Sequence, residues 1–83
     1  MTADELETRL RAALAPEHIV VNDDSHQHAG HAGAREGRHF SVSITSLRFA
    51  GLKPLARHRL VYDALGPLGS LGIHALAIDA RSE

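Results

Sequence analysis

Residues 49–65 read FAGLKPLARHRLVYDAL, and this stretch decides the fold because it predicts a turn followed by a helix. Gly51 closes a short turn or helical piece that starts at Ser46, and Pro54 suits the first turn of the helix that follows. The helix is expected to bury one apolar stripe, with Leu60 beside it, at Val61, Ala64, Leu65 and Leu68. The short piece and the helix form a candidate helix-turn-helix pair.

The N-terminal residues predict a second helix with a well-defined start. Thr2 and Glu5 have the spacing of a capping box, in which each side chain satisfies a backbone N–H of the other residue. Leu6, Leu10 and Leu14 then recur at helical spacing, and Pro16 ends the helix. This segment is expected to be an amphipathic helix that packs on the core.

Three segments predict strands. Residues 19–21 are β-branched and are followed by turn-forming residues at 22–25. Residues 39–46 alternate apolar and polar side chains, which predicts a half-buried antiparallel strand with one solvated face. Residues 73–80 predict a third strand. The order is therefore α-β-β-α-α-β, an α+β two-layer domain with a three-stranded sheet and helices on one face, in which residues 1–83 form a single domain.

Size and composition narrow the classes of function. The chain has 83 residues, no cysteine and a formal net charge of -1, so it has no disulfide framework and is not a strong whole-surface nucleic-acid binder. No signal peptide or membrane-spanning run is apparent, and a cytoplasmic location is the default expectation. The sequence contains no recognisable catalytic triad motif, so we expect no enzymatic activity.

Histidine is the residue type that points to chemistry. Seven histidines occur, and His26, His28 and His31 fall in a glycine-rich stretch, residues 25–37, which predicts a long flexible loop. His74 lies far along the chain, in the third predicted strand. Neutral imidazole is a good ligand for zinc, iron and copper, so the two segments form a candidate split metal site. The competing interpretation is packing, because strict alternation would put His74 on the same face as Leu76 and Ile78.

Several linked motifs resemble the BolA family. Residues 49–65 match the signature F-x-G-x-x-x-x-x-R-H-R-x-V-Y-x-x-L, and residues 73–78, IHALAI, are similar to the I/V-H-A-L strand of that family. Asp24-Ser25 followed by His28, and Gly37 followed by His39-Phe40, resemble its first hairpin. The resemblance spans about residues 6–80.

The resemblance implies a fold, a partner and a cofactor. BolA-like proteins have a fold similar to a class II KH domain, bind monothiol glutaredoxins and share with them a bridging [2Fe-2S] cluster, for which the glutaredoxin and glutathione supply thiolates. It implies histidine ligands from the strand, His74, and from the loop, where His28 matches the position of the family ligand and His31 lies close by. The chain alone is expected to be a monomer or weak dimer. His39 is expected to have a structural role and His58 to lie on the helix surface.

Two other functions remain open. Some members of the family are described as DNA-binding transcriptional regulators, and Lys53, Arg57 and Arg59 are the residues that would contact phosphate here. The turn before the helix lacks the second glycine of a G-x-x-G loop, which disfavours RNA binding of the KH type. The remaining option is binding of zinc or copper by the loop histidines alone.

Overall fold

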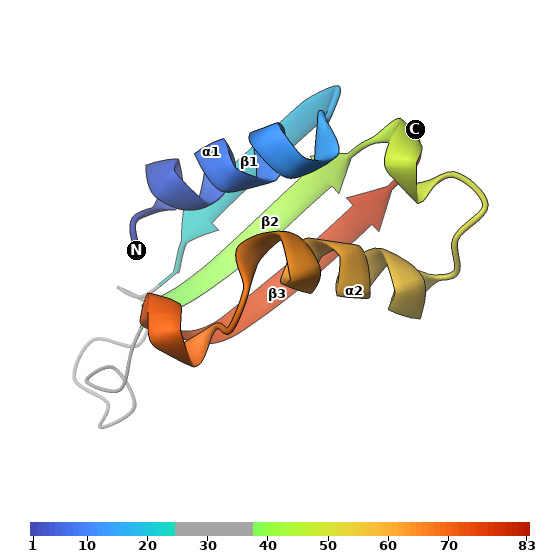
Figure 1. Cartoon of the computed structure of the whole chain (residues 1–83). Coiled ribbons are helices and arrows are strands. Elements are labelled where there is room, and N and C mark those ends of the chain that lie inside the picture. Colours follow the sequence, from blue (N-terminus) through green and yellow to red (C-terminus); the bar gives the residue numbers. More distant parts are fainter. Residues whose placement is uncertain (25–37) are drawn as a thin grey trace.

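The computed structural model describes residues 1–24 and 38–83 and has two layers, a three-stranded sheet and a pair of α-helices (Figure 1). The described elements, including two 3-10 helices labelled η, are α1 (Ala3–Leu14), β1 (His18–Asp23), β2 (Arg38–Thr45), η3 (Leu47–Phe49), α2 (Pro54–Leu65), η4 (Gly69–Leu71) and β3 (Ile73–Arg81). The predicted α+β class and element order are confirmed, with the short piece after Ser46 present as η3.

Both helices begin where the sequence predicts. The Thr2 and Glu5 capping box is present at the start of α1, and the helix ends at Leu14, with Ala15 in the left-handed region at φ 45°. Pro54 occupies the first turn of α2. That helix ends at Leu65 and is capped by Gly66, with φ 86°. Leu68 therefore lies beyond the helix and packs against the core from the connection to β3.

The sheet is mixed, with strand order β1-β2-β3. The central strand β2 pairs antiparallel with β1 and parallel with β3, so the prediction of a purely antiparallel strand was incomplete. The chain leaves β2 and returns to β3 through η3, α2 and η4, and a crossover of this length brings the next strand back in the same direction.

The first strand is longer than its apolar run. The prediction of residues 19–21 was wrong at both ends, since β1 starts at His18 and continues through Asp23. Asn22 pairs with Ser41 and Asp23 with Phe40, so the ladder to β2 overrides the turn preference of these residues.

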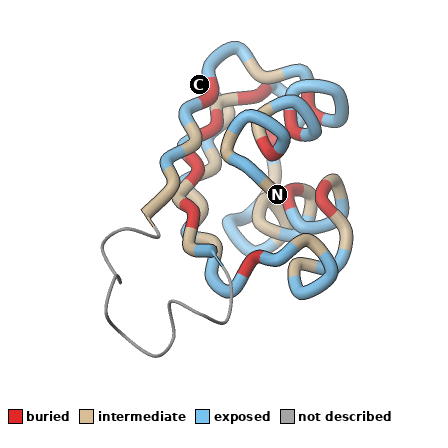
Figure 2. The backbone as a smooth tube through the Cα atoms, turned by 90° about the vertical axis from the view of Figure 1, so that its left-hand side faces the viewer, coloured by how far each residue is buried: buried red, intermediate tan, exposed pale blue. Residues whose placement is uncertain are grey.

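The core lies between the sheet and the helices, and within residues 1–24 and 38–83 no helix covers the opposite face of the sheet (Figure 2). The alternation of β2 sends Phe40, Val42 and Ile44 into the core, where each is at most 2% exposed. Ser41, Ser43 and Thr45 lie on the other face, which we call the open face of the sheet. The buried side chains that close the core from the helices include Leu6, Leu10, Leu14, Phe49, Val61 and Leu65.

Candidate functional site

A change of register places His74 on the surface. Arg38 of β2 pairs with Ile73 of β3, and the next residue, His39, pairs with Ala75, so β3 has one extra residue at this point. Ile73 is buried while His74 and Ala75 are both exposed. The competing interpretation, in which His74 packs on the same face as Leu76 and Ile78, was wrong, because strict alternation fails where a strand carries an extra residue.

His39 lies beside His74. The centroids of the two imidazole rings are 5.1 Å apart and the ring planes are tilted by 48°. Sequence reasoning gave His39 a structural role, and the proximity of the two rings was missed. The alternation of β2 already indicated that His39 precedes Ser41 and Ser43 on the open face, but the neighbouring strand was not evident from that pattern.

This pair of histidines lies at one end of the sheet, where β2 and β3 both begin (Figure 1). Asp24 and Arg38, the described residues on either side of segment 25–37, lie at the same end of the sheet. The Asp24 N–H donates to the His39 carbonyl at 2.7 Å, and the Arg38 guanidinium donates to the Asp23 carboxylate, also at 2.7 Å. The ion pair is partly exposed and contributes at most about 1 kcal/mol, so the strand ladder is the main support of this end.

The predicted loop ligands His28 and His31, and the alternative His26, lie outside the described residues. Within residues 1–24 and 38–83, no group of three or more His, Cys, Asp or Glu side chains is placed to hold a metal ion. The imidazoles that the described residues bring together at this end of the sheet are those of His39 and His74. They fit the metal chemistry expected of a chain with no cysteine, which can contribute nitrogen ligands but depends on another molecule for thiolates.

The three cations assigned to a nucleic-acid surface differ in their surroundings. Lys53 and Arg59 are exposed. Arg57 is half-buried, and its guanidinium donates to the carbonyls of Leu52 at 2.8 Å and Ala80 at 3.2 Å. Its side chain joins the start of α2 to the end of β3, so its charge is directed at the protein's own backbone.

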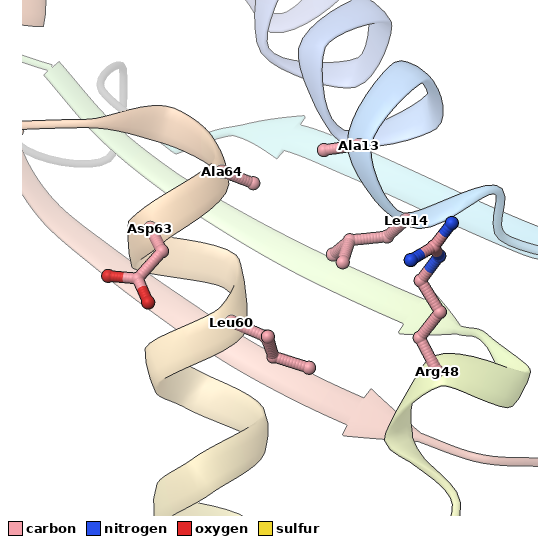
Figure 3. A pocket seen from close by; sticks show the side chains of 6 residues that line it. All are labelled: Ala13, Leu14, Arg48, Leu60, Asp63 and Ala64. Carbon is pink, nitrogen blue, oxygen red and sulfur yellow. The ribbon is translucent and has the colours of Figure 1, made fainter.

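A pocket lies between α1, η3 and α2, away from the two histidines (Figure 3). It has a volume of about 500 Å³, and Leu14, Leu60 and Ala64 give it an apolar lining. Arg48 extends toward α1, whereas the Asp63 carboxylate points away from Leu60 and Leu14 (Figure 3). The two charged groups do not converge on a common point, which an acid–base or nucleophilic site would require.

None of the helices in the described residues combines the length and the hydrophobicity needed to cross a bilayer.

Comparisons with known proteins agree on one family. The family model described as BolA-like protein matches residues 10–83. "Protein BOLA1, chloroplastic" of Arabidopsis thaliana is 39% identical over 84 residues, covering 96% of this chain and 52% of the relative. The "DNA-binding transcriptional regulator BolA" of Escherichia coli is 40% identical over 78 residues, covering 94% of this chain and 72% of that protein.

Solved structures give the same result. The structure of BolA1 from Arabidopsis thaliana is 40% identical, with a TM-score of 0.81, and the match covers 98% of this chain and 90% of that chain. The chain spans about half the length of several curated relatives, the share being 52% for the chloroplastic protein.

Proposed function

This chain belongs to the BolA-like protein family, and we propose that it is a non-enzymatic partner of a monothiol glutaredoxin, with which it shares a bridging [2Fe-2S] cluster. Its role would be assembly or transfer of the cluster, or sensing of iron. The observation that carries the proposal is the exposure of His74 at the end of the sheet, beside His39.

The donor set of the chain fits such a shared cluster. A [2Fe-2S] cluster has four terminal ligands, and a chain with seven histidines and no cysteine can supply only the nitrogen half. His74 would be one ligand. His28 or His31 would supply the other, because the residues that flank segment 25–37 lie at the same end of the sheet as His74. Imidazole ligation gives a cluster a higher reduction potential than thiolate ligation alone.

The position of His74 also suits access by a partner. His74 lies in β3 between Ile73 and Ala75, which pair with Arg38 and His39 of β2. Its side chain is exposed, and no further described element covers the open face of the sheet (Figure 2). A ligand held by a strand keeps its direction, which favours exchange of a cluster between two proteins without refolding of either one.

The test is reconstitution with a monothiol glutaredoxin. The two proteins are mixed with iron, sulfide and glutathione, and the visible absorption and circular dichroism are compared with those of the glutaredoxin alone. We expect a new spectrum for the wild-type mixture and its loss or alteration with His74→Ala. His18→Ala is the matched control, because His18 is an exposed histidine at the opposite end of the sheet. A wild-type spectrum identical to that of the glutaredoxin alone contradicts the proposal.

A second candidate function is DNA binding, which the name of the Escherichia coli relative favours. Lys53 and Arg59 are the exposed cations of the basic set in this chain. Binding through phosphate contacts would weaken steeply with salt, and each contact that is lost would reduce the slope of log K against log salt by about 0.9. Charge reversal at Lys53 and Arg59 should therefore weaken DNA binding. Unchanged affinity of that double variant would remove this candidate.

A further inference from the structure

We propose that the pocket between α1, η3 and α2 binds an anionic amphiphile, namely a carboxylate carried on an alkyl chain of medium length. The alkyl chain would lie against the apolar lining of the pocket, and the carboxylate would pair with Arg48. This site is separate from the two histidines, and neither the cluster proposal nor the DNA-binding candidate uses the residues that line it.

Small side chains keep the pocket open. Ala13 of α1 and Ala64 of α2 lie on its two walls, and their methyl groups do not fill the space between the helices (Figure 3). Leu14 and Leu60 extend toward each other from the same two helices and supply larger apolar groups (Figure 3). The volume of about 500 Å³ lies within the range of roughly 300–1,000 Å³ that is typical of sites for small molecules. An alkyl chain in this pocket would gain about fourfold in affinity for each methylene group that it buries.

The charges beside the apolar lining favour an anionic head group. Arg48 is exposed, its side chain extends toward α1, and among residues 1–24 and 38–83 no carboxylate is paired with it (Figure 3). The Asp63 carboxylate points away from Leu60 and Leu14 (Figure 3). A guanidinium group binds a carboxylate through charge-assisted hydrogen bonds, so Arg48 can hold the head group while the alkyl chain contacts the leucines.

Hydrogen bonds fix the walls of the pocket before any ligand binds. The buried Ser46 hydroxyl donates to the Leu14 carbonyl at 2.7 Å and accepts from the Arg48 N–H at 3.2 Å, so one side chain positions both a wall residue and the cation. The Arg9 guanidinium donates to the Leu65 carbonyl at 3.2 Å and joins α1 to the end of α2. A site that is already formed loses little conformational freedom on binding, which leaves more of the interaction energy for affinity.

The experiment is NMR titration of the isolated, isotope-labelled chain with hexanoate, octanoate and decanoate, each below its micelle concentration and at neutral pH, where the carboxylates are ionised. We expect the signals of Ala13, Leu14 and Leu60 to shift. Those of Val20 should stay in place, since Val20 is 54% exposed on the open face of the sheet and reports non-specific apolar contact. The dissociation constant should fall by about four- to fifteenfold for each extension by two carbons.

The charge of the head group and the shape of the pocket are tested separately. Octylammonium has the same alkyl chain as octanoate with the opposite charge, and it should bind at least about threefold more weakly. Ala13→Leu should weaken octanoate binding at least about fivefold, because the larger side chain occupies the pocket. Ala12→Leu is the matched control, since Ala12 is an exposed alanine of the same helix outside the lining. Arg48→Gln should weaken binding about threefold, whereas Lys53→Gln, at an exposed cation outside the pocket, should leave it unchanged.

Circular dichroism checks the fold of the variants, and the titration of the unmutated chain does not depend on it. The proposal is overturned if the pocket signals do not shift or if Val20 shifts with the same dissociation constant. Equal affinities for octanoate and octylammonium, or for Ala13→Leu and Ala12→Leu, would overturn it as well. Because no glutaredoxin, iron or sulfide is present, these outcomes leave the cluster-sharing function to be judged by its own reconstitution.

Discussion

Replacement of Arg57 by methionine should destabilise the fold, although the residue was first assigned to a nucleic-acid surface. Its guanidinium donates to the carbonyls of Leu52 and Ala80, 28 residues apart in the chain. Ala80 belongs to β3, which is an edge strand, so among the described residues no strand pairs with one side of its backbone. Arg57 supplies donors to that edge and to the turn before α2.

The magnitude follows from these two hydrogen bonds. A hydrogen bond to a charged group contributes about 1.5–3 kcal/mol, and because Arg57 is half-buried, water can replace part of the pair, which leaves a loss of about 2 kcal/mol for Arg57→Met. Methionine keeps much of the apolar stem, so the loss reports on the guanidinium. For a domain of this size, 2 kcal/mol lowers the melting temperature by about 8–16 °C.

The assay is thermal and urea unfolding followed by far-ultraviolet circular dichroism. Arg59→Met is the matched control, since Arg59 lies on the same helix and is exposed. Arg57→Lys should fall between Arg57→Met and the wild type, because an ammonium group lacks the fork that reaches two carbonyls at once. If Arg57→Met and Arg59→Met unfold at the same temperature, the structural role of Arg57 is refuted. If Arg57 has this structural role, an Arg57 variant can lose DNA binding because its fold is destabilised. Such a loss would then not show that Arg57 contacts phosphate.

Three further predictions concern the framework of the site. Ser46→Ala should lower the free energy of unfolding by about 1–3 kcal/mol, because the buried Ser46 hydroxyl donates to the last carbonyl of α1 at 2.7 Å and accepts from the backbone N–H of Arg48 in η3. The control Ser43→Ala, on the open face of the sheet, should change the free energy of unfolding by less than about 0.5 kcal/mol. Equal losses for the two variants in urea titrations would contradict this account. Gly51→Ala should destabilise the fold by about 1–2 kcal/mol, since Gly51 has φ 76°, whereas the control Gly69→Ala should be nearly neutral. Melting temperatures would detect this difference, and equal melting temperatures would contradict the turn geometry at Gly51. His74→Ala should leave the melting temperature within about 2 °C of the wild type, because the side chain is exposed; a large drop would indicate a packing role in place of a ligand role.

Patterns within short stretches of the sequence were sufficient to predict the helices and strands and the faces that they bury. The capping box at Thr2 and the proline at position 54 marked both α-helix starts, and the alternation from Phe40 to Ile44 identified the core face of β2. These signals depend on interactions within one element, where spacing along the chain decides which side chains share a face. The family motifs in residues 49–65 and 73–78 could likewise be identified from continuous runs of the sequence.

Relations between elements were harder to predict. The parallel pairing of β2 with β3 and the continuation of β1 through Asp23 depend on which backbone groups meet across the sheet. The role of Arg57 was missed for a related reason, because its acceptor Ala80 belongs to a strand that only the crossover brings next to α2.

The amino-acid sequence by itself determined that this chain is a small α+β domain of one family, rich in imidazole and without thiols. Only the tertiary structure decided where His74 lies and that His39 is its neighbour. The physical reason is the extra residue at the start of β3, which turns His74 outward from the core face. Periodicity within a strand predicts the facing of a side chain only while the strand keeps its register with the next one, and register is set by contacts between distant parts of the chain.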